Sequence, residues 1–226
     1  VAKHGAMAHL IMADQNRSSS AASKRILERA YALKTPDEAK ALYGDWAVSY
    51  DQHLEQGLNY IAPACIAQIL VNVLADRTAS ILDIGCGTGL VGAYLVGHGY
   101  SAIDGLDFSA EMLNQARSKQ IYQKLLPGDL NTVLDIPDQT YDAGISCGTF
   151  THGHVKADAL DEILRVLKPG ACFACTIHRE VWQSAGFGSK FAQLTASGVA
   201  ELESMNEQPF YENAPDDGRF CVIRRL

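Results

Sequence analysis

The chain has 226 residues and a formal net charge of −7 at pH 7. Hydrophobic residues make up 47% and charged residues 20% of the sequence, which excludes wholesale disorder and a membrane-embedded chain. The negative charge repels polyanions, so we expect no nucleic-acid partner. We also expect no membrane partner and a monomer or homodimer. Because the sequence has no recognisable targeting segment, a cytoplasmic location is expected.

The first predicted helix begins after a polar segment. Residues 1–34 are predicted to be a flexible N-terminal tail, because the stretch from Asp14 to Ser23 is polar and rich in serine. Thr35 then provides a capping hydroxyl before Pro36, and we expect a helix that runs to about Tyr43. Residues 35–226 are expected to form a single domain. A second helix is predicted from an amphipathic face made of Ile66, Ile69, Leu70, Val73 and Leu74.

From residue 80 onward, strand-like and helix-like patterns alternate, which predicts a parallel sheet with helices on both faces. The predicted strands span residues 80–84, 102–106, 122–126, 141–146, 171–178, 199–212 and 218–225. The helix before the fifth strand has apolar positions at Leu160, Ile163, Leu164 and Leu167, and Lys168-Pro169-Gly170 is expected to end it and turn the chain. The last two strands are expected to form an antiparallel pair. The fold class is therefore α/β, with a seven-stranded, mostly parallel sheet.

The six cysteines are expected to be free, buried thiols, because most lie within apolar strand or helix patterns. Cys172 and Cys175 have the C-x-x-C spacing, but on a strand these two positions point to opposite faces. We therefore expect no metal site.

A glycine-rich turn joins the first predicted strand to the next helix. Gly85, Gly87 and Gly89 allow positive φ angles and close approach of a ligand, and the helix start offers free N–H groups to an anion. The alternative is a tight turn with no ligand. Asp83 precedes the turn, and the third glycine of the dinucleotide fingerprint falls where this chain has Leu90. A carboxylate there opposes a pyrophosphate and suits an ammonium group, such as that of a methionine moiety.

Two further aspartates follow predicted strands. Asp107 ends the second strand beside the glycine turn, where its oxygens can accept both hydroxyls of a ribose. The alternative is that Asp107 or Ser109 caps the next helix. Asp129 follows the third strand and could accept a hydrogen bond from an adenine amino group with Leu130 beside the ring, although a turn aspartate is its simpler role.

Five motifs in order along the chain resemble those of class I S-adenosylmethionine-dependent methyltransferases, which implies a Rossmann-like fold. The motifs are Asp83–Gly89, Gly105–Ser109 with Met112-Leu113, Gly128-Asp129, Tyr141-Asp142 and Leu167–Gly170. The segment Tyr43–Asp51 is similar to a lid segment of many members. Together with Ile121-Tyr122-Gln123 it resembles most the methyltransferase-like group that includes the Williams-Beuren syndrome region member.

This resemblance implies S-adenosyl-L-methionine as the cofactor, with S-adenosyl-L-homocysteine as the product, and a helical lid over residues 35–58. Tyr50 would close over the cofactor. The implied cofactor-binding residues are Asp83, Gly85, Cys86, Gly87, Gly89, Asp107, Phe108, Met112, Asp129, Leu130, Cys147, Tyr43, Trp46 and Tyr50.

Methyl transfer from a sulfonium is an in-line displacement, which requires alignment and exclusion of water and needs a base only if the nucleophile carries a proton. His152 and His154 after the fourth strand are the first candidates for a base, with Tyr50 as a further catalytic residue. His178, at the end of the fifth strand, is another histidine of this edge. Each histidine could equally be an ordinary loop residue.

The acceptor is expected to be a small molecule, because little chain lies between the fifth strand and the closing strand pair. Tyr60, Trp182 and Tyr211 could line an acceptor pocket or complete the core. Two alternatives remain: a non-catalytic protein that binds S-adenosylmethionine, and a nicotinamide-dependent oxidoreductase.

Overall fold

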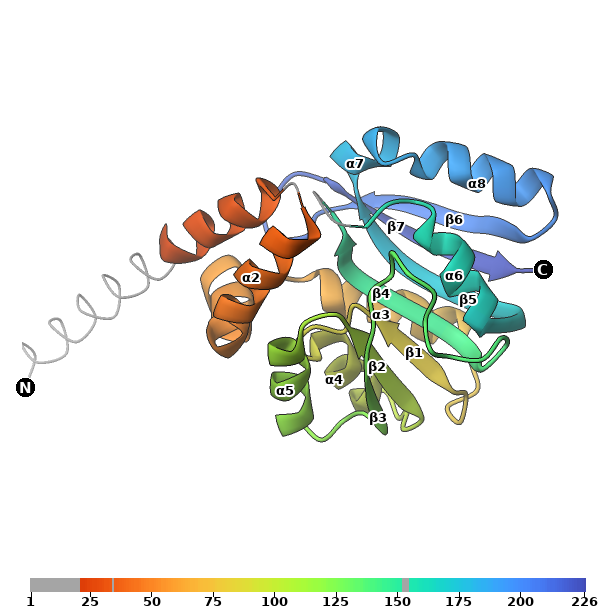
Figure 1. The fold of residues 1–226 in the computed structure, drawn as a ribbon, viewed down its shortest axis with the longest axis horizontal. Coiled ribbons are helices and arrows are strands. Elements are labelled where there is room, and N and C mark those ends of the chain that lie inside the picture. The colour runs from red at the N-terminus through yellow and green to blue at the C-terminus, as the bar shows by residue number, and fades with distance from the viewer. Residues whose placement is uncertain (1–20, 34, 152–154) are drawn as a thin grey trace, which may run out of the picture.

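A computed structural model of the chain describes residues 21–33, 35–151 and 155–226. Its strands form one sheet in the order β3-β2-β1-β4-β5-β7-β6 (Figure 1). The strands are β1 (Ile81–Ile84), β2 (Ile103–Asp107), β3 (Lys124–Pro127), β4 (Tyr141–Phe150), β5 (Leu167–His178), β6 (Ala200–Gln208) and β7 (Gly218–Arg225). β1 to β5 are parallel to one another, and β7 is antiparallel to both β5 and β6. The predicted seven-stranded, mostly parallel sheet is confirmed.

Helices cover both faces of the sheet, because alternate residues of a strand point to opposite sides. The helices are α2 (Pro36–Trp46), α3 (Ala62–Val73), α4 (Leu90–Gly97), α5 (Ala110–Ser118), α6 (Ala159–Val166), α7 (Arg179–Ser184) and α8 (Phe187–Ala196). In β1, Ile81 packs with Ile66 of α3 and Leu95 of α4 in one core cluster. Leu82 and Ile84 pack in a second cluster, which also takes residues of α6 and α8. Among the described helices, none is both long and apolar enough to cross a membrane.

The described part of the N-terminal segment is helical and lies against one end of the sheet (Figure 1). Residues 21–31 form a helix, although the sequence assigns no element there. The 3-10 turn η1 (Ala47–Ser49) and the π-helical turn η2 (Gln52–Gln56) follow α2. Ala30, Leu42, Trp46 and Leu54 form a separate apolar cluster, here called the N-terminal cluster, which holds these elements together. The residues come from different helices and turns, and their mutual packing explains why this largely polar segment folds.

α2 begins as predicted and ends later. Thr35 accepts a hydrogen bond from the Glu38 backbone N–H at 3.2 Å, which confirms the capping hydroxyl. The helix continues past Tyr43 to Trp46 because Leu42 and Trp46 are both buried in the N-terminal cluster.

The fourth and fifth strands also differ from their predicted bounds. β4 continues beyond Ser146 to the fully buried Phe150, with a register shift against β5. Leu167, predicted on the face of α6, instead begins β5 opposite Tyr141. The segment Lys168–Gly170 is accommodated as an irregularity at the start of that strand rather than as a turn before it. The extension of β4 matters for the site, because it places a further set of side chains at the carboxyl edge of the sheet.

Cys172 packs in one core cluster and Cys175 in the other, which confirms that the two thiols point to opposite faces. All six cysteines are free. Over the described ranges, no group of three or more His, Cys, Asp and Glu side chains is arranged to hold a metal ion.

Candidate functional site

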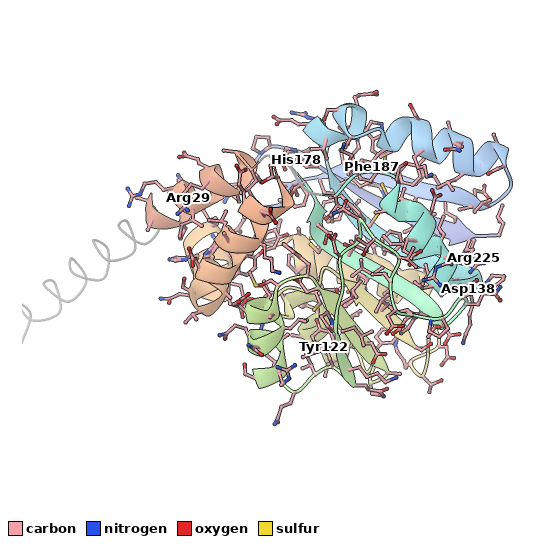
Figure 2. The ribbon with its side chains drawn as sticks, in the orientation of Figure 1. Arg29, Tyr122, Asp138, His178, Phe187 and Arg225 are labelled. Atoms are coloured by element: carbon pink, nitrogen blue, oxygen red, sulfur yellow. The ribbon has the colours of Figure 1, made fainter. Side chains whose placement is uncertain are left out.

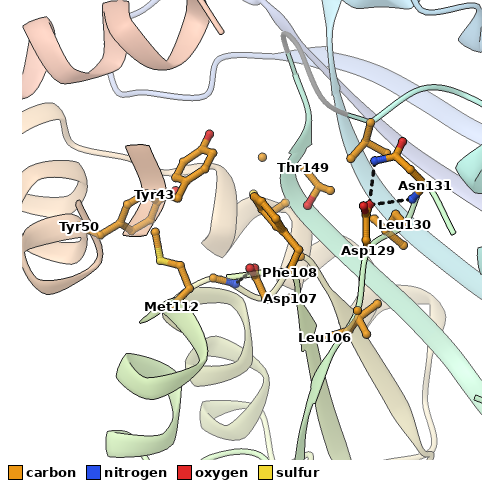
Figure 3. A pocket seen from close by; sticks show the side chains of 16 residues that line it. Tyr43, Tyr50, Leu106, Asp107, Phe108, Met112, Asp129, Leu130, Asn131 and Thr149 are labelled. Atoms are coloured by element: carbon orange, nitrogen blue, oxygen red, sulfur yellow. Dashed lines mark hydrogen bonds between the residues drawn. The ribbon is translucent and has the colours of Figure 1, made fainter. Parts of the chain in front are cut away.

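A cleft opens at the carboxyl ends of β1, β2 and β4, with about 720 Å³ of space between its walls (Figure 3). Its position follows from the strand order: β1 has β2 on one side and β4 on the other, so the crossovers diverge here and leave a crevice. The lining residues are Tyr43, Tyr50, Gly85, Gly87, Leu106, Asp107, Phe108, Met112, Gly128, Asp129, Leu130, Asn131, Cys147, Gly148, Thr149 and Val155.

The three glycines of the turn after β1 have positive φ angles of 66°, 54° and 93° but serve different purposes. Gly85 and Gly87 line the cleft, and a Cβ on Gly85 would lie 2.1 Å from Oγ1 of Thr149. Gly89 does not line the cleft; a Cβ there would lie 3.0 Å from the ring of Tyr122. Two glycines therefore expose backbone to the cleft, and the third makes room for an aromatic side chain. Cys86, also predicted to bind cofactor, lies outside the lining as well.

Asp107 holds the glycine turn against the start of α5. Its Oδ2 accepts the Gly87 backbone N–H at 2.8 Å, and its Oδ1 accepts the Ser109 backbone N–H at 2.9 Å. Burial raises the pKa of this carboxyl, and these backbone N–H bonds oppose the rise. Ser109 caps α5 by accepting the Met112 N–H at 3.2 Å. A carboxylate has about four acceptor positions, so Asp107 keeps capacity for a ligand that enters the cleft.

Asp83 lies below the turn rather than in the cleft wall. It is fully buried, and the Tyr122 hydroxyl donates to its Oδ2 at 2.6 Å. Figure 2 shows Tyr122 at the end of the sheet where β2 and β3 lie. Asp83 Oδ1 accepts no hydrogen bond of ordinary geometry from any residue the structure describes. Burial raises the pKa of Asp83 to about 7, although the bond from Tyr122 lowers it.

Replacing Asp83 with asparagine is expected to flatten the pH dependence of stability. The folded-state pKa of about 7 lies above the usual aspartate value of 3.8, so the folded protein binds more protons than the unfolded chain between these two pH values. The contribution of Asp83 to the free energy of unfolding is therefore greatest below pH 3.8 and is lost as the pH rises to about 7. The rise from 3.8 to about 7 corresponds to a total loss of about 4 kcal/mol, of which about 3 kcal/mol falls between pH 5 and pH 8.

Urea unfolding of both proteins at pH 5, 6, 7 and 8 measures this difference. The side-chain oxygen of the asparagine would still accept the Tyr122 bond, so packing changes little. A constant difference between wild type and the Asp83→Asn variant across this range would show that Asp83 is already ionised in the folded protein.

The far wall of the cleft comes from the loop after β3. Asp129 Oδ1 accepts bonds from the Asn131 backbone N–H at 2.9 Å and from Asn131 Nδ2 at 2.8 Å (Figure 3). This Asx turn is the simpler role that the sequence offered for Asp129, and it also presents Leu130 to the cleft. Phe108 and Met112, both expected to bind cofactor, lie in the lining of the cleft, whereas Asn131 and Val155 had no sequence signal.

The extended end of β4 lines the cleft with Cys147, Gly148 and Thr149. Cys147 Sγ lies 3.4 Å from the Tyr60 hydroxyl, and burial raises the pKa of Cys147 to about 12. Thr149 donates to the Ile84 carbonyl at 3.2 Å, which ties β4 to the glycine turn. Thr149 was missed because its position depends on the extra residues of β4, which the sequence did not predict.

A second cavity, here called the inner chamber, adjoins the cleft. It has about 400 Å³ of space and shares Tyr43, Tyr50 and Gly148 with the cleft. Its lining is Leu27, Ala30, Tyr31, Tyr43, Trp46, Tyr50, Leu54, Tyr60, Gly148, Thr151, Phe210 and Tyr211. Trp46 thus faces the inner chamber rather than the cleft.

The aromatic residues proposed for an acceptor pocket divide between two places. Tyr60 and Tyr211 line the inner chamber, with ring centroids 5.0 Å apart. Trp182 lies elsewhere, stacked on Phe191 at 5.3 Å and beneath the Arg219 guanidinium. Trp182 therefore belongs to the core and not to this cavity.

Asp51 joins the N-terminal segment to the body of the domain. It accepts a hydrogen bond from the Thr88 hydroxyl in the glycine turn, and its other oxygen lies 2.7 Å from Lys119 Nζ after α5. Tyr43 and Tyr50 are consequently held over the cleft by a contact to the turn itself.

The predicted catalytic histidines, His152 and His154, lie outside the described residues. His178 is buried, 3.6 Å from Asp217 Oδ2 and stacked on Phe210, and lines neither cavity. Figure 2 shows it near the N-terminal helices. The structure therefore places no histidine of its described ranges in the lining of either cavity.

Comparison with known proteins identifies relatives of the chain. Residues 82–175 match the family model described as a methyltransferase domain. The chain is 38% identical over 146 residues to human methyltransferase-like protein 27, covering 62% of this chain and 59% of that protein. It is 32% identical over 137 residues to the malonyl-[acyl-carrier protein] O-methyltransferase of Pseudescherichia vulneris, covering 60% of this chain and 51% of that protein. The chain thus spans between half and three fifths of these relatives.

The fold is similar to that of a methyltransferase solved in complex with the Haloferax volcanii Trm112 methyltransferase activator. The TM-score is 0.62 at 20% identity, and the match covers 81% of this chain and 96% of the other. This likeness confirms the predicted Rossmann-like architecture.

Proposed function

Because the chain carries a class I S-adenosylmethionine-dependent methyltransferase domain, we propose that it transfers the sulfonium methyl group of S-adenosylmethionine to a small-molecule acceptor. One observation carries the proposal: the cleft beside the glycine turn meets the inner chamber at Gly148. A donor in the cleft and an acceptor in the chamber would then face each other across that residue.

The residues of the cleft suit the cofactor. Gly85 and Gly87 offer backbone without side chains to the amino-acid portion, and Asp107 offers carboxylate oxygens to the ribose hydroxyls. Leu130 and Phe108 offer apolar surface to the adenine. When bound, the cofactor supplies an electrophilic methyl group.

The residues of the chain would contribute alignment and protection from water. Tyr43 and Tyr50 line both cavities and can cover the junction between them. Burial raises the pKa of Tyr50 well above its usual value, so its hydroxyl stays protonated and would act as a hydrogen-bonding group rather than as a base. His152 or His154 remains our proposed base for an acceptor that must lose a proton.

A small acceptor is favoured over a nucleic acid by the charge of −7, which repels polyanions. The P. vulneris relative is named for a carrier-protein substrate. The activity test must therefore distinguish a free small-molecule acceptor from an acceptor that is bound to a carrier protein.

Two measurements test the proposal. S-adenosylhomocysteine at a hundredfold excess over its Kd should stabilise the fold by about 2.7 kcal/mol, which corresponds to a rise in Tm of roughly 5–10 °C. Labelled S-adenosylmethionine should transfer its methyl group to the small-molecule fraction of a cell extract. Label that appears only in the macromolecular fraction would refute a small acceptor, and stabilisation without any transfer would indicate a non-catalytic binding protein.

We also propose that residues 35–58 act as a lid. Asp51, Tyr43 and Tyr50 connect this segment to the glycine turn and to both cavities. Cofactor binding should hold the segment closed, so S-adenosylhomocysteine should slow trypsin cleavage at the exposed Lys40 at least about threefold. Cleavage at the exposed Arg179 of α7 is the control and should not change. Equal rates at Lys40 with and without the ligand would rule out a lid.

A further inference from the structure

The inner chamber has an uncharged wall. Each described residue that lines it is aliphatic, aromatic, a glycine or a threonine. The carboxylates that act electrostatically on its tyrosines lie outside the lining: they are Asp51, Asp107, Glu180 and Asp217. Asp51 bonds to Thr88 and Lys119, Asp107 accepts the Gly87 and Ser109 backbone N–H groups, and Asp217 Oδ2 lies 3.6 Å from His178. An anion or a cation in the chamber would therefore meet no counter-ion among the described lining residues.

The tyrosine hydroxyls of the chamber are neutral at physiological pH. Burial raises the pKa of Tyr31 to about 12 and holds the pKa values of Tyr43, Tyr50, Tyr60 and Tyr211 above their usual range as well. Each hydroxyl can both donate and accept one hydrogen bond without adding charge.

Aromatic ring faces make up much of the wall. The rings of Trp46 and Tyr43 are stacked, with their centroids 6.3 Å apart and an interplanar angle of 11°. The rings of Trp46 and Tyr50 meet edge to face, with their centroids 4.7 Å apart. On the other side, Tyr60 and Tyr211 lie 5.0 Å apart. Such faces favour a flat ligand, which can form offset-stacked or edge-to-face contacts with them.

Charge decides between the ligand classes that fit an aromatic wall. Moving an unpaired ion out of water into such a cavity costs far more free energy than moving a neutral molecule with one hydrogen-bonding group. Aromatic faces can offset part of that cost for a cation. A cationic acceptor, however, would also be repelled by the sulfonium on the other side of Gly148.

We propose that the inner chamber binds the methyl acceptor and that this acceptor is a compact, uncharged molecule with a flat apolar body and one nucleophilic heteroatom. This inference rests on the proposed function. The lone pair of the heteroatom forms the new bond to the methyl carbon, the electron pair of the carbon–sulfur bond returns to sulfur, and a hydroxyl or thiol acceptor releases its proton.

Three probes of equal size and different charge test the inference: benzyl alcohol, benzoate and benzylamine, which is protonated at pH 7. Trp46 lines the chamber and Trp182 does not, so the emission of Trp46 in a Trp182→Phe variant reports on occupancy. With S-adenosylhomocysteine bound, benzyl alcohol should bind at least about tenfold more tightly than either ion. Calorimetry on the unmodified protein gives the same comparison if the variant does not fold.

Leu27→Phe should narrow the chamber and weaken benzyl alcohol binding at least about tenfold, while the Kd for S-adenosylhomocysteine stays unchanged because Leu27 lines only the chamber. Leu33→Phe is the matched control: Leu33 packs on the same N-terminal cluster but lines neither cavity, so both affinities should stay unchanged.

Equal or tighter binding of benzoate or benzylammonium, no binding of any probe, or binding that Leu27→Phe does not weaken would overturn the inference. Failure to bind S-adenosylhomocysteine would instead overturn the proposed function, so the two failures are distinguishable.

Discussion

Asp107→Ala is expected to raise the Kd for S-adenosylhomocysteine by about 100-fold. The substitution removes the carboxylate proposed to accept the ribose hydroxyls, and hydrogen bonds to a charged group contribute about 1.5–3 kcal/mol each. It also removes the acceptor for the Gly87 and Ser109 backbone N–H groups, which loosens the turn that lines the cleft. Isothermal titration calorimetry with S-adenosylhomocysteine measures the change.

Two controls separate the ribose contact from damage to the turn. Asp107→Asn keeps the shape and one acceptor oxygen, but its NH2 group would face a backbone N–H donor, so about a tenfold loss of affinity is expected. Ser109→Ala removes the cap of α5 at a cost in stability of about 1 kcal/mol and should leave the affinity within about twofold. Full affinity in Asp107→Ala would mean that the cofactor lies outside this cleft.

The sheet and its glycine turn were predictable because their signals are local. Thr35 and Ser109 mark helix starts through hydroxyls that accept N–H groups three residues ahead, and both caps are present. The alternation of apolar segments predicted the strands, and the position of Asp107 at the carboxyl end of β2 follows from that alternation alone. A short window of sequence contains all of this information.

The roles of the individual glycines were not predictable in the same way. The sequence assigns Gly85, Gly87 and Gly89 to one ligand cradle, but Gly89 accommodates Tyr122. Gly92 serves the same ring, because a Cβ there would lie 2.5 Å from the Tyr122 hydroxyl. Tyr122 reaches this place from the loop after α5, so only the folded arrangement of β1, α4 and β3 reveals which glycines remain for a ligand.

The inner chamber has the same origin in contacts between distant segments. Tyr60 and Tyr211 meet through an isolated bridge between the segment before α3 and the loop after β6. The sequence could name both residues as aromatic candidates but could not distinguish them from Trp182, which stacks on Phe191 in the core. Packing between distant elements decides which aromatic residue forms a cavity and which fills the core.

Gly148→Ala is expected to lower the rate of methyl transfer by about 100-fold while the Kd for S-adenosylhomocysteine changes less than about threefold. Gly148 has a φ of 74°, and a Cβ there would meet only one atom within 4 Å among the described residues, the Tyr60 hydroxyl oxygen at 2.9 Å. The new methyl group would thus narrow the junction between the cleft and the inner chamber. Transfer from labelled S-adenosylmethionine to the small-molecule fraction of a cell extract is the readout.

Tyr60→Phe in the same chain distinguishes this narrowing from backbone strain. The left-handed conformation costs an alanine about 1–2 kcal/mol of stability whether or not the Tyr60 hydroxyl is present. Removing that hydroxyl relieves the contact, so the double variant should regain at least about tenfold in rate, and Tyr60→Phe alone should retain a rate within about threefold of the wild type. An unchanged rate in Gly148→Ala would show that methyl transfer does not cross this junction. A double variant as slow as Gly148→Ala would assign the loss to strain at the end of β4 and not to a narrowed passage.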